Sequence, residues 1–408
     1  MLLQFTVENF QSIKQRTTLD MMSVGGKEIT EFKNSLLREK YLPKAVIYGP
    51  NGGGKTTLLR AFLVMQILIT SYSNFFGGIQ IGRPIPKPQV NPFKFDKDSV
   101  NKPTLFEILI EINKIQYKYG LSVFRGAIKE EYLYEKKENL TIEPVFIRNG
   151  QVIEKSPVEV KGIAPDMPLL VFIRQFYDVQ AIKEVVDFFL KTCFVDYNVH
   201  FQAEALMINI FDIERNPKLS GMKIKILKMF SDIGIKVVNY SIDEKPSVIN
   251  NQIGKEFTVK TKHNVNNEFY ELMYHEESNG TQKLFTLIPL FISSLTEGRV
   301  IFVDELDAKL HPKLLEYVIK LYSDKEINVG SGQLIFTSHD MTTMNKDIFR
   351  RDEIYFMSLS ESQDSELFSL VEIRGKDGRV VRNDGSFSKQ YLEGRYGADP
   401  YYIKMKSW

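Results

Sequence analysis

Residues 1–10 alternate between apolar and polar side chains, and this period of two predicts a half-buried strand. Residues 45–48 are continuously apolar and predict a second, fully buried strand. The glycine-rich residues 49–56 follow, and the apolar density of residues 57–70 predicts a helix that packs into a core. This part of the chain therefore predicts a strand, a loop and a helix in direct succession.

The period of two returns between residues 103 and 135. Asn113 with Lys114, and Arg125 with Gly126, interrupt the pattern as short turns. Alternating segments joined by such turns predict an antiparallel sheet built from hairpins.

The spacing of apolar residues becomes helical between residues 165 and 235, which predicts a helical insertion. Strand-like patterns return at residues 236–243, 257–262 and 268–273. Residues 278–340 then read as a helix, a very apolar strand, another helix and another apolar strand. This last series is typical of an α/β core and is expected to complete it.

The composition of the 408 residues is that of an ordinary soluble globular protein. The 53 Lys and Arg residues nearly balance the 51 Asp and Glu residues, so the net charge of +2 does not indicate nucleic-acid binding. The single cysteine, Cys193, allows no internal disulfide and favours a reducing compartment, the cytoplasm by default. The apolar stretches fall short of the roughly 20 residues that a membrane span requires, so no membrane association is expected.

A phosphate-binding motif lies between the first buried strand and its helix, and residues 49–56 read GPNGGGKT. The motif satisfies G-x-x-x-x-G-K-[ST] in the strand, loop and helix context that it requires. Glycines let backbone N–H groups face an anion, Lys55 can reach the β- and γ-phosphates, and the Thr56 hydroxyl can hold Mg²⁺. The alternative is a glycine-rich turn followed by an unrelated Lys-Thr pair.

A carboxylate pair, Asp304 and Glu305, follows the very apolar residues 300–303. A buried strand with acidic residues at its carboxyl end is typical of a Walker B strand. Asp304 is expected to bind Mg²⁺ and Glu305 to polarise the attacking water, because adjacent strand residues point to opposite sides and so suit two roles. The alternative is an acidic, solvated strand end.

Two further segments contain candidate site residues. QLIFTSHD is an apolar strand that ends at His339, whose neutral imidazole could reach a γ-phosphate or its water; the alternative is a structural histidine. EESNGTQKLF is a polar turn that opens an apolar helix, where Ser278 can cap the helix and Gly280 allows close approach of an anion. The alternative for this turn is an ordinary capped helix.

Taken in order, GPNGGGKT, SNGTQ, VIFVDELD and FTSHD resemble the motif series of ATP-binding-cassette (ABC) ATPases of the RecF-like and OLD-like kind. More narrowly, the chain resembles bacterial stand-alone AAA-type ATPases of the RloA-like and PARIS AriA-like anti-phage defence kind, also in its opening MLLQFTVENFQSIK and closing YLEGRYGADP. The resemblance implies an α/β P-loop NTPase fold with a RecA-like core, an antiparallel β subdomain and a helical insertion. It divides the chain into residues 1–160, 165–235 and 236–408.

The resemblance also implies roles for individual residues. Glu305, His339 and Lys55 would be catalytic, and Asp307 would belong to the D-loop. Mg²⁺ would be held by Thr56 and Asp304. The residues that would contact ATP come from the phosphate-binding loop and from the signature turn, and they are Gly49, Pro50, Asn51, Gly52, Gly53, Gly54, Lys55, Thr56, Thr57, Ser278, Asn279, Gly280 and Gln282.

The function that the resemblance implies is an ATPase that forms a homo-oligomer through composite ATP sites. It would act as a sensor or scaffold in an abortive-infection system and control a separate effector, such as a Toprim-like nuclease or another toxin. A nucleic acid or a phage protein would be its trigger. The alternative is a RecF-like DNA-repair ATPase, which requires a basic groove. A transporter subunit is disfavoured because the signature reads SNGTQ.

The chain departs from the family pattern in several places. Gln11 stands where such proteins often have Arg, and the Q-loop glutamine is not assigned, with Gln89 and Gln175 as candidates. The residues after His339 contain no Asp-x-Asp, so a Toprim-type nuclease site is not expected in this chain. The later arginines, from Arg350 onward, are interpreted as a solvated face rather than a nucleic-acid surface.

Overall fold

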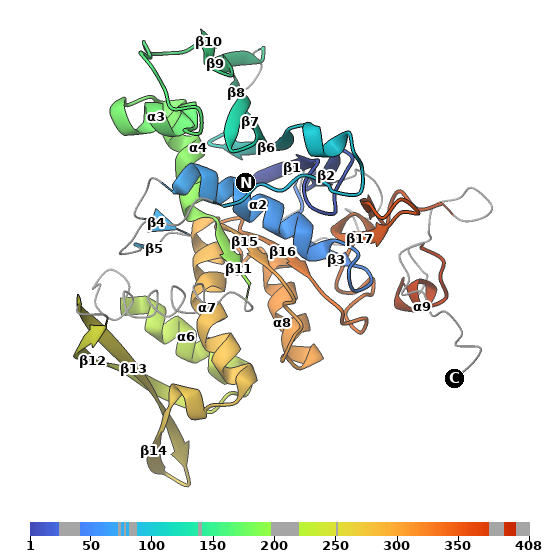
Figure 1. Cartoon of the computed structure of the whole chain (residues 1–408). Coiled ribbons are helices and arrows are strands. Elements are labelled where there is room, and N and C mark those ends of the chain that lie inside the picture. Colours follow the sequence, from blue (N-terminus) through green and yellow to red (C-terminus); the bar gives the residue numbers. More distant parts are fainter. Residues whose placement is uncertain are drawn as a thin grey trace.

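The computed structural model describes residues 1–23, 41–71, 75–76, 79–80, 88–137, 141–196, 220–249, 252–374 and 387–396. The described residues form two large sheets, a three-stranded sheet that projects from the body and a two-stranded sheet, with helices on both faces of the central sheet (Figure 1). This arrangement confirms the expected α/β class.

The central sheet has six strands in the spatial order β11, β15, β16, β3, β17 and β18. In that order they span Cys193–Val195, Val300–Val303, Gln333–Thr337, Lys44–Tyr48, Ile354–Leu359 and Ser365–Ser369. The first five strands are parallel, and β18 is antiparallel to β17. Every residue of β3, β15 and β16 is buried, which explains their continuous apolar runs.

Helices cover both faces of this sheet. Helix α2 (Lys55–Thr70) packs on one face, and α7 (Asn279–Glu297) and α8 (Pro312–Ser323) pack on the other. Successive strand residues alternate between the two cores: Ala45 lies in the core with α2, whereas Val46 lies in the core with α7 and α8. The central sheet is therefore the middle of three layers (Figure 1).

The second large sheet is antiparallel and has the strand order β10, β9, β8, β7, β6, β1 and β2. These strands span Val152–Lys155, Glu143–Asn149, Ala127–Lys136, Ile115–Phe124, Thr104–Ile112, Leu2–Glu8 and Thr17–Asp20. Both expected hairpin turns are confirmed: Asn113, Lys114, Arg125 and Gly126 all have positive φ, as two-residue turns between twisted strands require. Strand β1 is more buried than expected, because Phe5 also packs edge-on against Phe62 of α2.

The expected helical region at residues 165–235 contains α3 (Leu169–Phe176), α4 (Gln180–Lys191) and α6 (Ser220–Asp232). Residues 197–219 lie outside the described residues. Two observations differ from a purely helical insertion. Apolar residues of α3 and α4 belong to the same core as α2, and β11 after α4 forms the edge of the central sheet. Strand β11 is only three residues long, and it is too short to show a period of its own.

A three-stranded antiparallel sheet follows, made of β12 (Val237–Ile249), β13 (Gln252–Val265) and β14 (Glu268–Met273). It confirms the three expected strands, although β12 and β13 are longer than the pattern indicated. Figure 1 shows this sheet projecting at the end of α7 where that helix begins.

The pattern indicated that the α/β core ends at residue 340, but the core continues beyond that residue. Strands β17 and β18 extend the central sheet beyond β3, and Arg350 just before them is buried beside Asp352 rather than part of a solvated basic face. The remaining short elements are β4 (Phe75–Phe76), β5 (Ile79–Gln80), η1 (Ser99–Asn101), η3 (Tyr274–Glu276), η4 (Arg351–Glu353) and α9 (Phe387–Leu392). Among the described helices, none combines the length and the hydrophobicity needed to cross a bilayer.

Candidate nucleotide-binding site

The candidate site lies where β15, β16 and β3 end. These three strands are parallel neighbours, so their carboxyl ends meet at one edge of the sheet. Residues 49–56 follow β3, Asp304 and Glu305 follow β15, and His339 follows β16. The fold thereby brings together three motifs that are far apart in the sequence.

The phosphate-binding loop has a backbone that glycine permits. Gly49, Gly52 and Gly54 all have positive φ. At Gly49 a Cβ would also collide with the carbonyl oxygen of Met357 on β17, so a larger residue would push the loop off the sheet. Helix α2 begins at Lys55, within the motif, so its N-terminus, where the first backbone N–H groups have no partner inside the helix, lies at the loop.

Lys55 folds back onto this loop. Its Nζ donates hydrogen bonds to the carbonyl oxygens of Gly49 (2.8 Å) and Pro50 (3.0 Å). Burial lowers the pKa of Lys55, and nearby carboxylates, Asp304 foremost, oppose this shift. Within the described part of the chain, the Lys55 ammonium group is therefore hydrogen-bonded only to neutral carbonyl acceptors of the loop. A bound anion could replace these acceptors.

Three hydrogen-bonded side chains join the phosphate-binding loop to the ends of β15 and β16. The Thr56 hydroxyl donates to Asp304 Oδ2 (2.8 Å), and the Thr337 hydroxyl donates to Asp304 Oδ1 (2.6 Å). Asp304 is buried, and its hydrogen-bond donors are neutral hydroxyls. A buried carboxylate next to hydroxyl oxygens is a donor set that suits Mg²⁺, so these residues fit the expected metal.

Glu305 lies in a turn rather than on the strand. Strand β15 ends at Val303, and Glu305 has a left-handed φ of 51°. Its N–H donates to Thr337 Oγ1 (2.7 Å), and its side chain is exposed. The expected separation of Asp304 and Glu305 is therefore produced by this turn and not by strand alternation.

Residues 305–310, which contain the expected D-loop residue Asp307, are called the D-loop below, and the Asp307 side chain connects them to the end of β16. Its Oδ2 accepts the N–H of His339 (3.1 Å), while its buried Oδ1 has no hydrogen-bond partner among the described residues. Burial, together with the nearby Lys55 ammonium, lowers the pKa of His339 below its usual value of 6.5. The imidazole is therefore neutral near pH 7.

The signature turn caps α7 and contacts its own D-loop. Ser278 Oγ accepts the N–H of Thr281 (3.2 Å), and Gln282 Nε2 donates to the Glu277 carbonyl (2.7 Å). A Cβ on Gly280 would lie 3.0 Å from the Lys309 carbonyl oxygen, so glycine permits this close approach. Asn279, like Ser278, is exposed. Within the described residues, no hydrogen bond joins this turn to the phosphate-binding loop.

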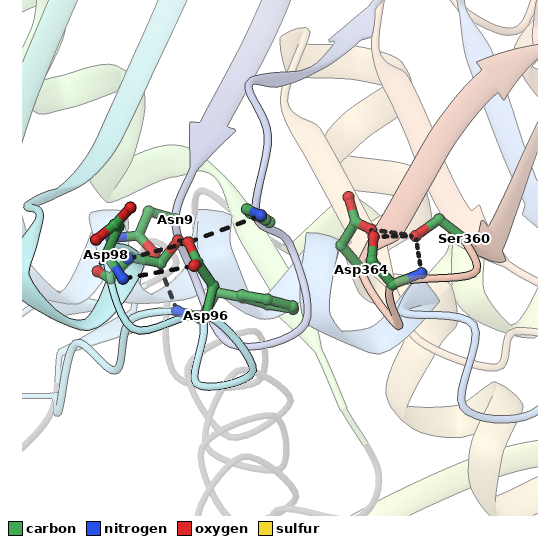
Figure 2. A network of polar contacts seen from close by, with 9 residues as sticks. Asn9, Asp96, Asp98, Ser360 and Asp364 are labelled. Atoms are coloured by element: carbon green, nitrogen blue, oxygen red, sulfur yellow. Dashed lines mark hydrogen bonds and ion pairs between the residues drawn. The ribbon is translucent and has the colours of Figure 1, made fainter.

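Two hydrogen-bonded loops flank the turn that follows β1 (Figure 2), and Ser365 at the end of one of them lies against Gly54 of the phosphate-binding loop. Ser365 Oγ donates to Ser12 Oγ (2.8 Å), which in turn donates to Thr57 Oγ1 (3.1 Å). Figure 2 shows the carboxylates of Asp96 and Asp364 on either side of the turn that follows β1. Each accepts hydrogen bonds within its own loop, and Asp96 also pairs with Lys14 of the turn (3.7 Å).

Sequence reasoning missed two residues of the site. Thr337 bridges Asp304 and Glu305, and the only sequence feature that could have indicated it is a small polar residue at a strand end. Lys283 donates to three D-loop carbonyls, and its signal is a lysine inside an apolar helix. Of the two candidate glutamines, Gln89 is exposed and Gln175 lies in the last turn of α3, which Figure 1 places far from the phosphate-binding loop.

The chain is similar to a known protein family and to solved structures. Residues 44–164 and 180–345 match the family model of an AAA domain described as a putative AbiEii toxin of a type IV toxin–antitoxin (TA) system. Similar solved structures include an SMC head domain from Thermotoga maritima, with 12% identity over 90% of this chain and 98% of that chain, and a TM-score of 0.44. Another is an SMC head bound to the C-terminal winged-helix domain of ScpA, with 13% identity over 90% and 97%, and a TM-score of 0.45. No curated protein matches the chain.

Proposed function

Because the chain belongs to the AAA-domain family described as putative AbiEii toxins of type IV TA systems, we propose that it hydrolyses ATP with Mg²⁺ at sites shared between two copies. The observation that carries this proposal is the hydrogen bond between Thr56 and Asp304, two residues 248 positions apart. It joins the phosphate-binding loop to a buried carboxylate in the arrangement that ATP with its metal requires. The basic test is to measure ATP hydrolysis with Mg²⁺ and after Mg²⁺ is chelated, when hydrolysis should stop.

Binding begins at the loop that follows β3. The triphosphate would meet the backbone N–H groups of residues 49–56 and the N-terminus of α2. Lys55 would exchange the Gly49 and Pro50 carbonyls for the β- and γ-phosphates, because a charged acceptor binds an ammonium more strongly than a carbonyl does. Mg²⁺, when bound, would be held by Thr56 and Asp304 and would neutralise developing phosphate charge.

Hydrolysis would then depend on the turn after β15. Its left-handed backbone directs the Glu305 side chain to the surface, where it can accept a proton from an attacking water. Thr337 holds this turn by accepting the Glu305 N–H while its hydroxyl donates to Asp304. His339 would contact the γ-phosphate or its water from the neighbouring strand as a neutral hydrogen-bonding group.

The signature turn supports a site shared between two copies. A phosphate that is bound by its own loop presents γ-oxygens outward, and the N-terminus of a helix is favourable for such an anion. Ser278 and Gly280 contact their own helix and D-loop within the described residues. We therefore assign the signature turn of one copy to the phosphate of another.

Ser278→Arg should leave ATP binding unchanged and lower turnover, because the large cation would block the approach of a second copy. Mixing it with Lys55→Ala should restore part of the activity, since one site in a mixed dimer combines an intact loop with an intact signature. Steady-state ATP hydrolysis of the two variants, alone and mixed, measures this effect.

Ser278→Asp is the matched variant, because Asp caps a helix as well as Ser does but places negative charge against the γ-phosphate. It should fold with unchanged stability and turn over slowly. Wild-type turnover in both variants would reduce this turn to a helix cap. A mixture that stays inactive despite demonstrated co-assembly would contradict independently active sites.

The lowered pKa of His339 predicts a specific pH dependence of ATP hydrolysis. Because this pKa lies below its usual value, the imidazole is neutral at neutral and alkaline pH, so its contribution should be constant there. As the pH falls through the lowered pKa the ring gains a proton, loses its acceptor nitrogen and adds charge beside Lys55, so turnover should fall. A pH profile of kcat for the wild type and for His339→Gln measures this, and persistence of the acidic limb in the variant would assign it to another group.

The family description supports a role in an abortive-infection or TA system. We propose that the ATP-bound assembly holds or activates a separate effector and that hydrolysis ends this state. ATP can act in this way because it makes all its contacts only when two copies have joined to form the shared site. A pull-down with the protein encoded by the neighbouring gene tests this role. The chain should retain that protein with ATP and release it without nucleotide.

A further inference from the structure

Lys283 occupies an unusual position in helix α7. It lies in the second turn after Ser278, is 5% exposed, and donates hydrogen bonds to three carbonyl oxygens of the D-loop. The acceptors are those of Glu305 (2.9 Å), Leu306 (2.9 Å) and Ala308 (2.8 Å). The three N–H donors of this ammonium group thereby bind carbonyl oxygens of a single turn, which lies in another segment of the chain.

Packing alone does not explain a lysine at this place. Leu284, Phe285 and Leu287, which follow Lys283 in α7, are apolar and buried, and a Met or Leu would fill the space of Lys283 without a charge. Burial lowers the pKa of Lys283 to about 8, opposed by Asp307 and Glu305. The cost of burying this charge is offset by the three carbonyl contacts and these two carboxylates.

The turn that Lys283 holds contains the reacting groups of the proposed mechanism. The Glu305 carbonyl accepts both Lys283 Nζ and the Ala308 N–H (3.1 Å), so the ammonium closes the turn that sets the direction of the Glu305 side chain. The same turn places Asp307, whose carboxylate accepts the His339 N–H. A rotation of this turn would therefore move Glu305 and Asp307 together.

Helix α7 also begins with the signature turn. The backbone of Gly280, one turn before Lys283, passes close to the far end of the same D-loop, since a Cβ there would lie 3.0 Å from the Lys309 carbonyl oxygen. The helix thus lies against the D-loop at Gly280 and is hydrogen-bonded to it at Lys283, so a displacement of its N-terminus is passed to the D-loop backbone through Lys283.

We propose that Lys283 is a positioning residue that couples the signature turn of a copy to Glu305 and Asp307 of the same copy. This inference rests on the proposed function, in which the signature turn serves the neighbouring copy's ATP. Because the two groups then belong to different ATP sites, Lys283 links occupancy of one site to the geometry of the other.

The central experiment compares Lys283→Met with the wild type. Methionine has a similar length and volume but no hydrogen-bond donor, so ATP affinity should stay within about twofold while kcat falls about ten- to a hundredfold, the effect expected for a misplaced catalytic group. Lys283→Arg retains charge and donors and should restore a substantial part of kcat. Lys313→Met, at an exposed position on α8, is the matched control and should behave as the wild type.

Hydrogen exchange of the D-loop amides separates this inference from the proposed function. In the nucleotide-free chain, the amides of Ala308 and Leu310 should exchange faster in Lys283→Met, while the amides of β15 and β16 keep their protection. This measurement needs no ATPase activity, so an inactive wild type would overturn the proposed function alone. Unchanged D-loop exchange or unchanged kcat would overturn the coupling, as would a loss of ATP affinity equal to the loss of kcat. If Lys283→Met does not fold, Lys283→Leu, which also lacks a hydrogen-bond donor, is measured with the same expectations.

Discussion

Glu305→Gln should bind ATP as the wild type does and hydrolyse it about 10²- to 10⁴-fold more slowly, the usual contribution of a general base. The amide keeps the shape of the side chain, and the Glu305 N–H can still donate to Thr337. Asp304 keeps its two hydroxyl partners, so the candidate metal site is unchanged. ATP should therefore remain bound without being cleaved, and the assembly joined through shared sites should accumulate.

Two measurements check this expectation. Single-turnover hydrolysis gives the chemical rate, and light scattering with ATP gives the mass of the assembly. Glu326→Gln, which removes a charge from an exposed position between α8 and β16, is the matched control and should behave as the wild type. A Glu305→Gln chain that hydrolyses ATP normally would remove Glu305 from the reaction, and one that stays as dissociated as the nucleotide-free protein would argue against an ATP-joined interface.

Lys55→Ala should weaken ATP binding by about 30- to 4,000-fold, the range that corresponds to about 2–5 kcal/mol for truncating one partner of a desolvated charge pair. Lys55 is the cation of the phosphate-binding loop, and burial already removes it from water. Its removal also takes the Lys55 donor from the Gly49 and Pro50 carbonyls, of which Pro50 keeps only the Gly53 N–H (3.1 Å) among the described residues, so the loop itself should become less ordered. Both effects act against the bound triphosphate.

Calorimetric titration with ATP and Mg²⁺ measures this loss, and thermal unfolding distinguishes it from loss of the fold. Lys313→Ala removes an exposed lysine and serves as the control for charge alone. A folded Lys55→Ala chain that retains the affinity and turnover of the wild type would exclude residues 49–56 as the triphosphate site.

Much of the central core could be predicted from the sequence because its strands are buried on both faces. Val300–Val303 and Gln333–Thr337 read as apolar runs of strand length, and the helices between them have their own period. Strand β11 could not be predicted in this way. Its three residues become a strand only because β15 offers an unpaired edge beside them.

The turn after β15 shows a second limit. Asp304 and Glu305 were expected at a strand end, and their separation was expected from the alternation of strand residues. The separation instead comes from a left-handed backbone at Glu305, which Thr337 and Lys283 hold from β16 and α7. No local pattern encodes this geometry, because the groups that impose it lie in other segments of the chain.

The sequence by itself determined the phosphate-binding loop, the order of the motifs and the α/β class, because each depends on neighbouring residues or on a period within one segment. Only the tertiary structure decided which distant groups meet: Thr56 with Asp304, Asp307 with His339, and Lys283 with the D-loop carbonyls. The physical reason is that hydrogen bonds act over about 3 Å. Such contacts follow from the order of strands in the sheet and the position of α7, which no single segment specifies.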